Sequence, residues 1–276
     1  MEYKFSVLMS VYYKENTDYL KQALESIENQ TLKAAEWVLV EDGILTDELY
    51  GVINQYKEKY GNFLKIIKLR KNSGLGEALM VGVQNCSYPL IARMDTDDIS
   101  RNDRFELQIN EFKKDPSLDI CGSHIYEFID DINNIVSTRI VPLEDKEIKE
   151  YQKRRDSFNH MSVMFKKQSV LDSGNYETCF LMEDTLLWVK MFLNNCKGKN
   201  IDDYLVYARV GKDMYSRRGG LKYFKKYRNA RKVIYKTGYI SYFDYLITIL
   251  IQFIVCIIPN RLREFIFKKL LHKEVQ

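Results

Sequence analysis

Apolar and polar residues follow two alternating rhythms along the first hundred positions. Four short, nearly continuous apolar runs predict buried strands. Between them, apolar residues recur every three or four positions, which predicts amphipathic helices. The predicted strands are residues 5–11, 37–40, 64–69 and 88–94, and the predicted helices are residues 17–30, 49–60 and 75–83.

This strand–helix alternation predicts an α/β fold with a mostly parallel sheet, helices on its faces and right-handed crossovers. Each predicted strand ends in a polar loop that carries Tyr, Glu, Asp, Asn or Gly. The carboxyl ends of parallel strands meet at one edge, where open sheets bind ligands. We therefore expect the four loops to form one site.

The second half of the chain has a less regular pattern. A helix is predicted around residues 105–112, strands at 118–128, 138–141 and 162–165, and a helix at 183–193. The last helix begins with Glu183 and Asp184, and acids in a first turn are favoured by the helix dipole. The sequence shows no internal repeat and no low-complexity segment.

The fourth strand runs directly into a cluster of acids. Asp95, Asp97 and Asp98 fall within four positions. Carboxylates this close repel one another unless a cation lies between them, so the cluster predicts a divalent metal site. The alternative is a solvated turn whose aspartates cap the helix that begins near Asn102.

The composition indicates a chain that can bury a hydrophobic core and whose C-terminal region is basic. Hydrophobic residues make up 46% of the 276 positions, enough for a core. The net charge is only +4, but from Asp213 onward 14 Lys and Arg stand against 4 Asp and Glu, which leaves 28 basic and 34 acidic residues before it. This asymmetry predicts an anionic partner for the tail.

The tail combines basic and apolar segments. Residues 217–236 hold nine Lys and Arg, residues 245–258 are an apolar run of 14, and residues 261–271 alternate basic with apolar positions. The run is shorter than the roughly 20 residues that span a bilayer. Attachment to an anionic membrane surface is the favoured interpretation, and a helical hairpin packed on its own domain is the alternative. Nucleic acid would leave the aliphatic run unexplained, so no nucleic-acid partner is expected.

The cysteine pattern and the first residues indicate a cytoplasmic protein. Five cysteines without a CxxC pair predict neither a disulfide framework nor a zinc cluster. The N-terminal apolar stretch is too short for a signal peptide. With the basic tail, this predicts a peripheral protein on the cytoplasmic face of the inner membrane.

Six motifs in order resemble those of the family 2 glycosyltransferases, whose fold is called GT-A. They are residues 6–12 with Glu15, residues 24–27 with Gln30 and Thr31, residues 40–43, Asn72 with Gly74, residues 93–98, and Glu183-Asp184 with Trp188. The resemblance covers residues 4 to about 220. It implies a GT-A domain over residues 1–215, with a nucleotide-binding half at 1–100 and an acceptor half at 101–215, followed by a membrane-associating tail at 216–276.

The resemblance also implies roles for individual residues. Asp97 would ligate Mn²⁺ or Mg²⁺, and Asp184 would be the catalytic base of an inverting transfer. Donor-binding residues would be Ser10, Tyr12, Glu15, Asp42, Asn72, Gly74 and Asp95. Further acceptor or phosphate contacts would come from Glu183, His160, Arg217 and Arg218.

The N-terminal half is most similar to bacterial capsule, exopolysaccharide and O-antigen transferases, including galactosyltransferases that act on undecaprenyl-diphosphate-linked sugars. This implies a nucleotide-diphospho-sugar donor, such as UDP-galactose, and a lipid-linked saccharide acceptor. Glu41 replaces the first acid of the family's Asp-Asp-Gly motif, which leaves base recognition to Asp42. The Gln-x-x-Arg-Trp motif of polysaccharide synthases is absent, which favours transfer of one sugar per acceptor.

Other interpretations stay open at this point. Asp42 could only shape a turn, Glu183 and Asp184 could only favour a helix terminus, and His160 could form a structural hydrogen bond. Arg217 and Arg218 could belong to a solvated basic face. The whole chain could be a membrane-associated nucleotide-sugar-binding scaffold without catalysis. A dinucleotide dehydrogenase is excluded because no GxGxxG follows the first strand.

Overall fold

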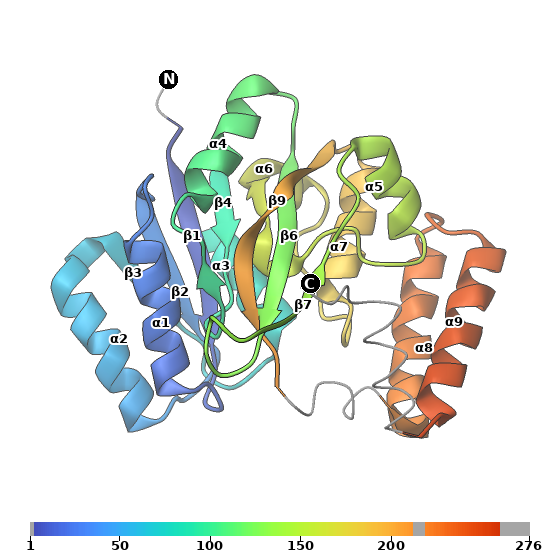
Figure 1. The fold of residues 1–276 in the computed structure, drawn as a ribbon, viewed down its shortest axis with the longest axis horizontal. Coiled ribbons are helices and arrows are strands. Elements are labelled where there is room, and N and C mark those ends of the chain that lie inside the picture. The colour runs from blue at the N-terminus through green and yellow to red at the C-terminus, as the bar shows by residue number, and fades with distance from the viewer. Residues whose placement is uncertain (1–2, 212–218, 260–276) are drawn as a thin grey trace.

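A computed structural model of the chain describes residues 3–211 and 219–259 (Figure 1). The strands are β1 Phe5–Val11, β2 Glu36–Glu41, β3 Leu64–Lys68, β4 Leu90–Arg93, β5 Ile99–Ser100, β6 Ile120–Phe128, β7 Ile135–Arg139, β8 Met164–Lys166 and β9 Gly198–Arg209. The α-helices are α1 Thr17–Glu28, α2 Asp47–Tyr60, α3 Leu75–Asn85, α4 Arg104–Lys114, α5 Asp145–Gln152, α6 Lys167–Asp172, α7 Glu183–Leu193, α8 Gly220–Lys236 and α9 Tyr242–Ile257. Short 3₁₀ helices are η1 Gly61–Phe63 and η2 His160–Ser162.

The strands form one nine-stranded sheet in the order β3-β2-β1-β4-β8-β6-β9-β5, with β7 paired to β6. The first four strands are all parallel. Beyond them the sheet is mixed, because β8 runs antiparallel to β4 and β6, whereas β6 and β9 are parallel. The predicted α/β architecture, with a mostly parallel sheet flanked by helices, is confirmed.

Alternate side chains of β1 build the two cores on either side of the sheet. Val7 and Met9 belong to the core under α1, α2 and α4, whereas Leu8 belongs to the core shared with α3 and α7. Successive strand residues point to opposite faces, and burying each such side chain contributes roughly 1.5–3 kcal/mol. Helix α3 packs so closely that a Cβ added at Gly82 would lie 2.3 Å from Leu8 Cδ1.

Most predicted elements exist close to their expected bounds, but two strands and two α-helices were not predicted. The helix expected at 183–193 is α7 with the same bounds, and the predicted strands at 118–128 and 138–141 correspond to β6 and β7. The structure adds the short strand β5, the helices α5 and α6, and the twelve-residue strand β9. Strand β9 is the most consequential addition, because it holds the acidic loop in place.

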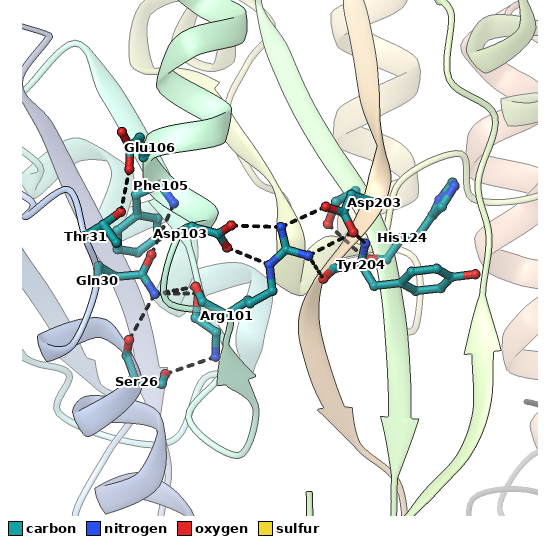
Figure 2. A network of polar contacts seen from close by, with 12 residues as sticks. Ser26, Gln30, Thr31, Arg101, Asp103, Phe105, Glu106, His124, Asp203 and Tyr204 are labelled. Carbon is teal, nitrogen blue, oxygen red and sulfur yellow. Dashed lines mark hydrogen bonds and ion pairs between the residues drawn. The ribbon is translucent and has the colours of Figure 1, made fainter. Parts of the chain in front are cut away.

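A polar network anchors the chain immediately after the acidic loop (Figure 2). The guanidinium of Arg101 binds Asp103 (Nε–Oδ1 2.6 Å) and Asp203 of β9 (Nη1–Oδ1 2.8 Å). The carbonyl of Arg101 accepts a hydrogen bond from Gln30 Nε2 (2.7 Å), just beyond α1. The segment after the acids is therefore tied to both α1 and β9.

Helices α8 and α9 form an antiparallel hairpin that packs against α7 at one side of the molecule (Figure 1). Ala230 and Ile234 of α8 share a core with Met182 and Leu186. The hairpin of the described tail is therefore partly packed on the α/β domain. Residues 260–276 lie outside the described part of the chain. Within the described ranges, no helix has the length and apolarity needed to cross a bilayer.

Candidate active site

A cavity of about 380 Å³ opens at the carboxyl edge of the four parallel strands. Its walls come from the ends of β1, β2 and β4 and from the loop between β3 and α3. The lining residues are Ser10, Tyr12, Glu15, Asp42, Asn72, Gly74, Leu75, Asp95, Thr96 and Asp97. All eight residues predicted to bind the nucleotide sugar or the metal are in this set, together with Leu75 and Thr96, which were not predicted.

Asp42 connects two walls of the cavity. Its carboxylate accepts hydrogen bonds from the backbone N–H groups of Ser73 (Oδ1, 2.7 Å) and Gly74 (Oδ2, 3.0 Å). The next residue, Gly43, has φ +89°, and a Cβ there would lie 2.5 Å from the backbone nitrogen of Asn72. The glycine is thus required by both backbone conformation and close approach. Asp42 shapes the loop at the start of α3, with its carboxylate at the cavity wall.

Glu15 and Thr96 connect the loop after β1 to the acidic loop. Thr96 Oγ1 donates to Glu15 Oε2 (2.6 Å), and it lies 3.3 Å from the carbonyl oxygen of Ser10. Tyr12 is 42% exposed at the cavity. The loops predicted to meet at the sheet edge are therefore in direct contact.

The three aspartates of the acidic loop have different partners. One carboxylate oxygen from each of Asp95, Asp97 and Asp98 lies within 4.8 Å of the others. Asp98 is buried and accepts the backbone N–H of Arg209 (Oδ1, 2.8 Å), as expected for a structural acid. Asp95 is paired with Arg93 through both oxygens, one of them at 2.6 Å from Nη1. Asp97 has no ion-pair partner among the described residues.

The chemistry of this cluster fits a hard divalent cation. Carboxylate oxygens are the ligands that Mg²⁺ and Mn²⁺ prefer. Burial, followed by the neighbouring carboxylates of Asp95 and Glu15, raises the pKa of Asp97 to about 7. A divalent cation would remove this electrostatic penalty, and Asp97 is the member of the cluster best placed to ligate it.

Arg93 belongs to the motif at residues 93–98, but no role was predicted for its side chain from the sequence. The residue is only 1% exposed, and its guanidinium forms the bidentate pair with Asp95. The buried guanidinium of Arg104 holds the same segment, because its Nη2 donates to the Arg93 carbonyl at 2.7 Å. Burial, followed by the nearby charge of Arg93, lowers the pKa of Arg104 to about 9. An arginine inside an apolar strand immediately before an acidic cluster is the signal that could have identified Arg93.

Asp184 lies in a second, adjoining polar site at the N-terminus of α7. Its Oδ1 accepts the backbone N–H of Thr185 (2.8 Å), and its side chain is 21% exposed. Burial, followed by the carboxylate of Asp156, raises the pKa of Asp184 to about 7. A carboxylate with this pKa suits proton abstraction near neutral pH.

His160 has a structural environment beside Asp184. Its Nε2 is 2.8 Å from the hydroxyl of Tyr176, whereas its Nδ1 is 3.9 Å from Asp184 Oδ2, too far for a hydrogen bond. Burial, followed by the charge of Arg93, holds the pKa of His160 well below its usual value, so the ring is neutral. The geometry favours a structural hydrogen bond over a phosphate contact.

Comparison with known proteins identifies the family. The profile of glycosyl transferase family 2 matches residues 6–173. The chain belongs to glycosyl transferase family 2.

Three relatives of this glycosyltransferase match over almost their whole length. A Haemophilus influenzae protein named an uncharacterized glycosyltransferase is 40% identical over 98% of this chain and 100% of its own. An Escherichia coli UDP-Gal:alpha-D-GlcNAc-diphosphoundecaprenol beta-1,3-galactosyltransferase is 37% identical over 98% of this chain and 97% of its own. The amylovoran biosynthesis glycosyltransferase AmsE of Erwinia amylovora is 35% identical, over 96% and 98%. The predicted resemblance to bacterial polysaccharide glycosyltransferases is confirmed.

Solved structures share the fold of the glycosyltransferase. Staphylococcus aureus TarS 1–349 in complex with UDP has a TM-score of 0.60 and 17% identity, covering 97% of this chain and 70% of that chain. The mannosyltransferase PcManGT from Pyrobaculum calidifontis, in complex with GDP-Man and Mn²⁺, has a TM-score of 0.63 and 13% identity, covering 84% and 64%. These likenesses confirm the GT-A-like fold.

Glu183 connects the wall of the cavity to the polar site that contains Asp184. A Cβ added at Gly76, in the first turn of α3, would lie 2.9 Å from Glu183 Cγ and 3.0 Å from the carbonyl oxygen of Glu177. Burial raises the pKa of Glu183. The start of α3, which forms part of the cavity wall, is therefore in contact with the first residue of the helix that carries Asp184. Arg217 and Arg218 lie outside the described residues.

Proposed function

We propose that this glycosyltransferase moves one sugar, with inversion, from a UDP-sugar to a lipid-linked saccharide in the biosynthesis of a cell-surface polysaccharide. The observation that carries the proposal is the cavity, because all eight predicted donor and metal residues line it. The adjoining Asp184, with a pKa near 7, supplies a base beside the donor site.

The donor and acceptor are inferred from the relatives. The E. coli relative is named for UDP-Gal as donor and for a GlcNAc-diphosphoundecaprenol acceptor. Nearly complete mutual coverage with that protein supports a substrate pair of the same chemical class. We therefore propose UDP-galactose as the first donor to test and an undecaprenyl-diphosphate-linked saccharide as the acceptor.

The proposed metal is Mn²⁺ or Mg²⁺, ligated by Asp97. When bound, it neutralises the charge that develops on the departing nucleotide diphosphate. Asp95, held by Arg93, would contact the ribose or help to hold the metal through water. Glu15 and Ser10 lie in the same cavity for contacts to the nucleoside.

Asp184 acts as the general base in this proposal. Its ionised carboxylate takes the proton from the acceptor hydroxyl as the oxygen attacks the anomeric carbon. The bond to the diphosphate breaks on the opposite face, so the configuration inverts and no covalent enzyme intermediate forms. Positioned bases of this kind contribute about 100- to 10,000-fold to rate.

We also propose that the enzyme works on the cytoplasmic face of the inner membrane as a peripheral protein. Residues 1–215 would be the catalytic domain and residues 216–276 the membrane-associating region. An acceptor with a lipid anchor and the basic, apolar tail support this location. We propose no nucleic-acid partner.

The test is UDP release from a panel of UDP-sugars with Mn²⁺, with and without a GlcNAc-diphospho-lipid analogue as acceptor. We expect acceptor-stimulated release with one donor, loss of that release with chelator, and weaker release in Asp97→Asn at a Mn²⁺ concentration that is half-maximal for the wild type. Asp172→Asn, the same chemical change at an exposed position, is the matched control. Absence of metal-dependent UDP release from every donor would overturn the proposal.

A further inference from the structure

The outward face of α9 is a continuous apolar stripe. The buried residues of α9 are Asp244, Thr248 and Cys256, all on one side of the helix. The opposite side exposes Tyr242, Phe243, Leu246, Leu250, Phe253, Ile254 and Ile257. Leu250 is 61% exposed and Ile254 is 49% exposed. Among the described residues nothing covers this face, and an apolar patch of this extent marks an interaction site.

The neighbouring helix α8 presents positive charge. It contains seven Lys and Arg and no Asp or Glu. Its buried side is formed by Ala230, Arg231 and Ile234, which leaves the other cations at the surface. The exposed cations are Lys222, Lys225, Lys226, Arg228, Lys232 and Lys236. Helices α8 and α9 lie side by side (Figure 1), so the helix that carries the exposed cations is the direct neighbour of the helix that carries the apolar stripe.

A third element, the turn at Phe180 and Leu181, lies next to this hairpin. Both side chains are exposed, by 49% and 43%. Leu181 has φ +69°, a left-handed conformation that leucine rarely adopts and that glycine would relieve. Lys226 of α8 lies 3.8 Å from the centre of the Phe180 ring. The base Asp184 follows Leu181 by three positions, so this apolar turn adjoins the catalytic site.

We propose that the α9 stripe, the α8 cations and the Phe180–Leu181 turn form one docking surface for an anionic phospholipid bilayer. This proposal deepens the membrane association proposed above for residues 216–276, because it names the docking surface and the lipid. It also rests on the proposed function for its consequence, which is that docking brings Asp184 to the membrane surface where a lipid-linked sugar emerges. Acidic headgroups complement α8, and the boundary of the acyl chains accommodates α9.

The dimensions of α9 also favour a helix lying in the plane of the bilayer. Its 16 residues span about 24 Å at 1.5 Å per residue, shorter than the roughly 30 Å hydrocarbon core. Its buried side carries Asp244, which pairs with Arg154 of the catalytic domain (Oδ1–Nε 2.6 Å). Insertion across the bilayer would break this ion pair, whereas docking on the surface preserves it.

The first experiment measures flotation of the full-length enzyme with phosphatidylcholine vesicles containing or lacking phosphatidylglycerol. We expect binding that requires the anionic lipid. Lys225→Gln/Lys232→Gln should weaken it about thirtyfold, from the roughly 1 kcal/mol contributed by each surface cation. Leu250→Ser/Ile254→Ser should weaken it at least tenfold. Lys113→Gln and Ile44→Ser, at exposed positions elsewhere, should bind like the wild type.

A second measurement tests the turn directly. An environment-sensitive fluorophore on Leu181→Cys should shift to the blue with anionic vesicles, whereas one on Glu58→Cys of α2, at the far side of the molecule, should not (Figure 1). The five native cysteines are buried, which allows selective labelling. An unchanged Leu181→Cys signal on bound protein would remove the turn from the surface and overturn the proposal as stated.

Other outcomes separate the rival occupants of the surface. Wild-type binding that is weak, or unaffected by the α9 and α8 variants, would overturn the proposal and indicate that residues 260–276 cover the stripe or bind lipid themselves. A dimer in sedimentation that Leu250→Ser/Ile254→Ser converts to a monomer would assign the stripe to a second copy. Acceptor-stimulated UDP release with a short-chain, water-soluble acceptor should be unchanged in the α8 and α9 variants. If the wild type showed no acceptor-stimulated UDP release, the proposed function would be contradicted, whereas the result of the vesicle binding would still stand.

Discussion

Replacing the proposed base, Asp184→Asn, should remove activity and make the protein more stable at alkaline pH. Turnover should fall at least a hundredfold, because an amide cannot take the acceptor proton. Donor binding should persist, because Asp184 is not among the residues that line the cavity. The hydrogen bond from the Thr185 N–H can be retained by the Asn side-chain oxygen.

The gain in stability follows from the raised pKa. Burial and the Asp156 carboxylate raise the pKa of Asp184 to about 7 in the folded protein, whereas an unfolded chain titrates near 3.9. Between these values the folded state binds more protons than the unfolded state. The wild type therefore loses stability as pH rises from about 4 to about 7, and it stays less stable above that range. About three pKa units correspond to at most about 4 kcal/mol.

The assay is thermal unfolding of wild type and Asp184→Asn at pH 5 and pH 8. The difference in free energy of unfolding should grow by about 2–3 kcal/mol between these pH values, which shifts the melting temperature by roughly 2–4 °C for each kcal/mol. Asp172→Asn, at the exposed end of α6, should show no comparable growth. A constant difference, a less stable variant at pH 8, or near-normal turnover would refute the reasoning.

Three further predictions concern residues in the N-terminal half of the chain. Asp97→Asn should raise the Mn²⁺ concentration needed for half-maximal UDP release at least tenfold, because charged ligands dominate the affinity of a protein site for hard cations. A titration of the metal measures this change. Arg93→Met should destabilise the protein by about 3–5 kcal/mol in chemical denaturation, since it leaves Asp95 without its buried partner, whereas removing both charges with Asp95→Asn should recover part of the loss. Gly82→Ala should cost about 1–3 kcal/mol of stability without changing the metal requirement, because the new methyl group would overlap Leu8.

The nucleotide-binding half was predictable because its strands are buried on both faces. Such strands appear as apolar runs, and parallel topology then places their polar ends together. Strand β9 escaped prediction because Asp202 and Asp203 interrupt its apolar pattern, and its pairing with β6 shifts register near His124. Helix α5 buries only Ile148 and Gln152, too few positions for a recognisable stripe.

The sequence allowed us to predict which residues belong to the candidate site, but not which of them form ion pairs with one another. Sequence order shows that Asp95 and Asp97 belong to one loop. Only the folded chain shows that Arg93 pairs with Asp95, whereas Asp97 has no ion-pair partner in the described part of the chain. The same holds for Asp184, whose pKa is raised by burial and, after that, by the carboxylate of Asp156, 28 positions earlier in the sequence. Ionisation depends on such three-dimensional neighbours, which a linear motif does not specify.

The contact between Gly76 and Glu183 limits how relatives of this enzyme could be recombined. The glycine lies in the proposed donor half and the glutamate begins the helix that carries the proposed base Asp184, and no room exists for a Cβ between them. A chimaera that joins the donor half of one parent to the acceptor half of another must preserve this fit. If the donor parent supplies even an alanine at this position, the Glu183 side chain and the backbone at Glu177 must shift, and we expect the hybrid to bind nucleotide yet transfer sugar slowly.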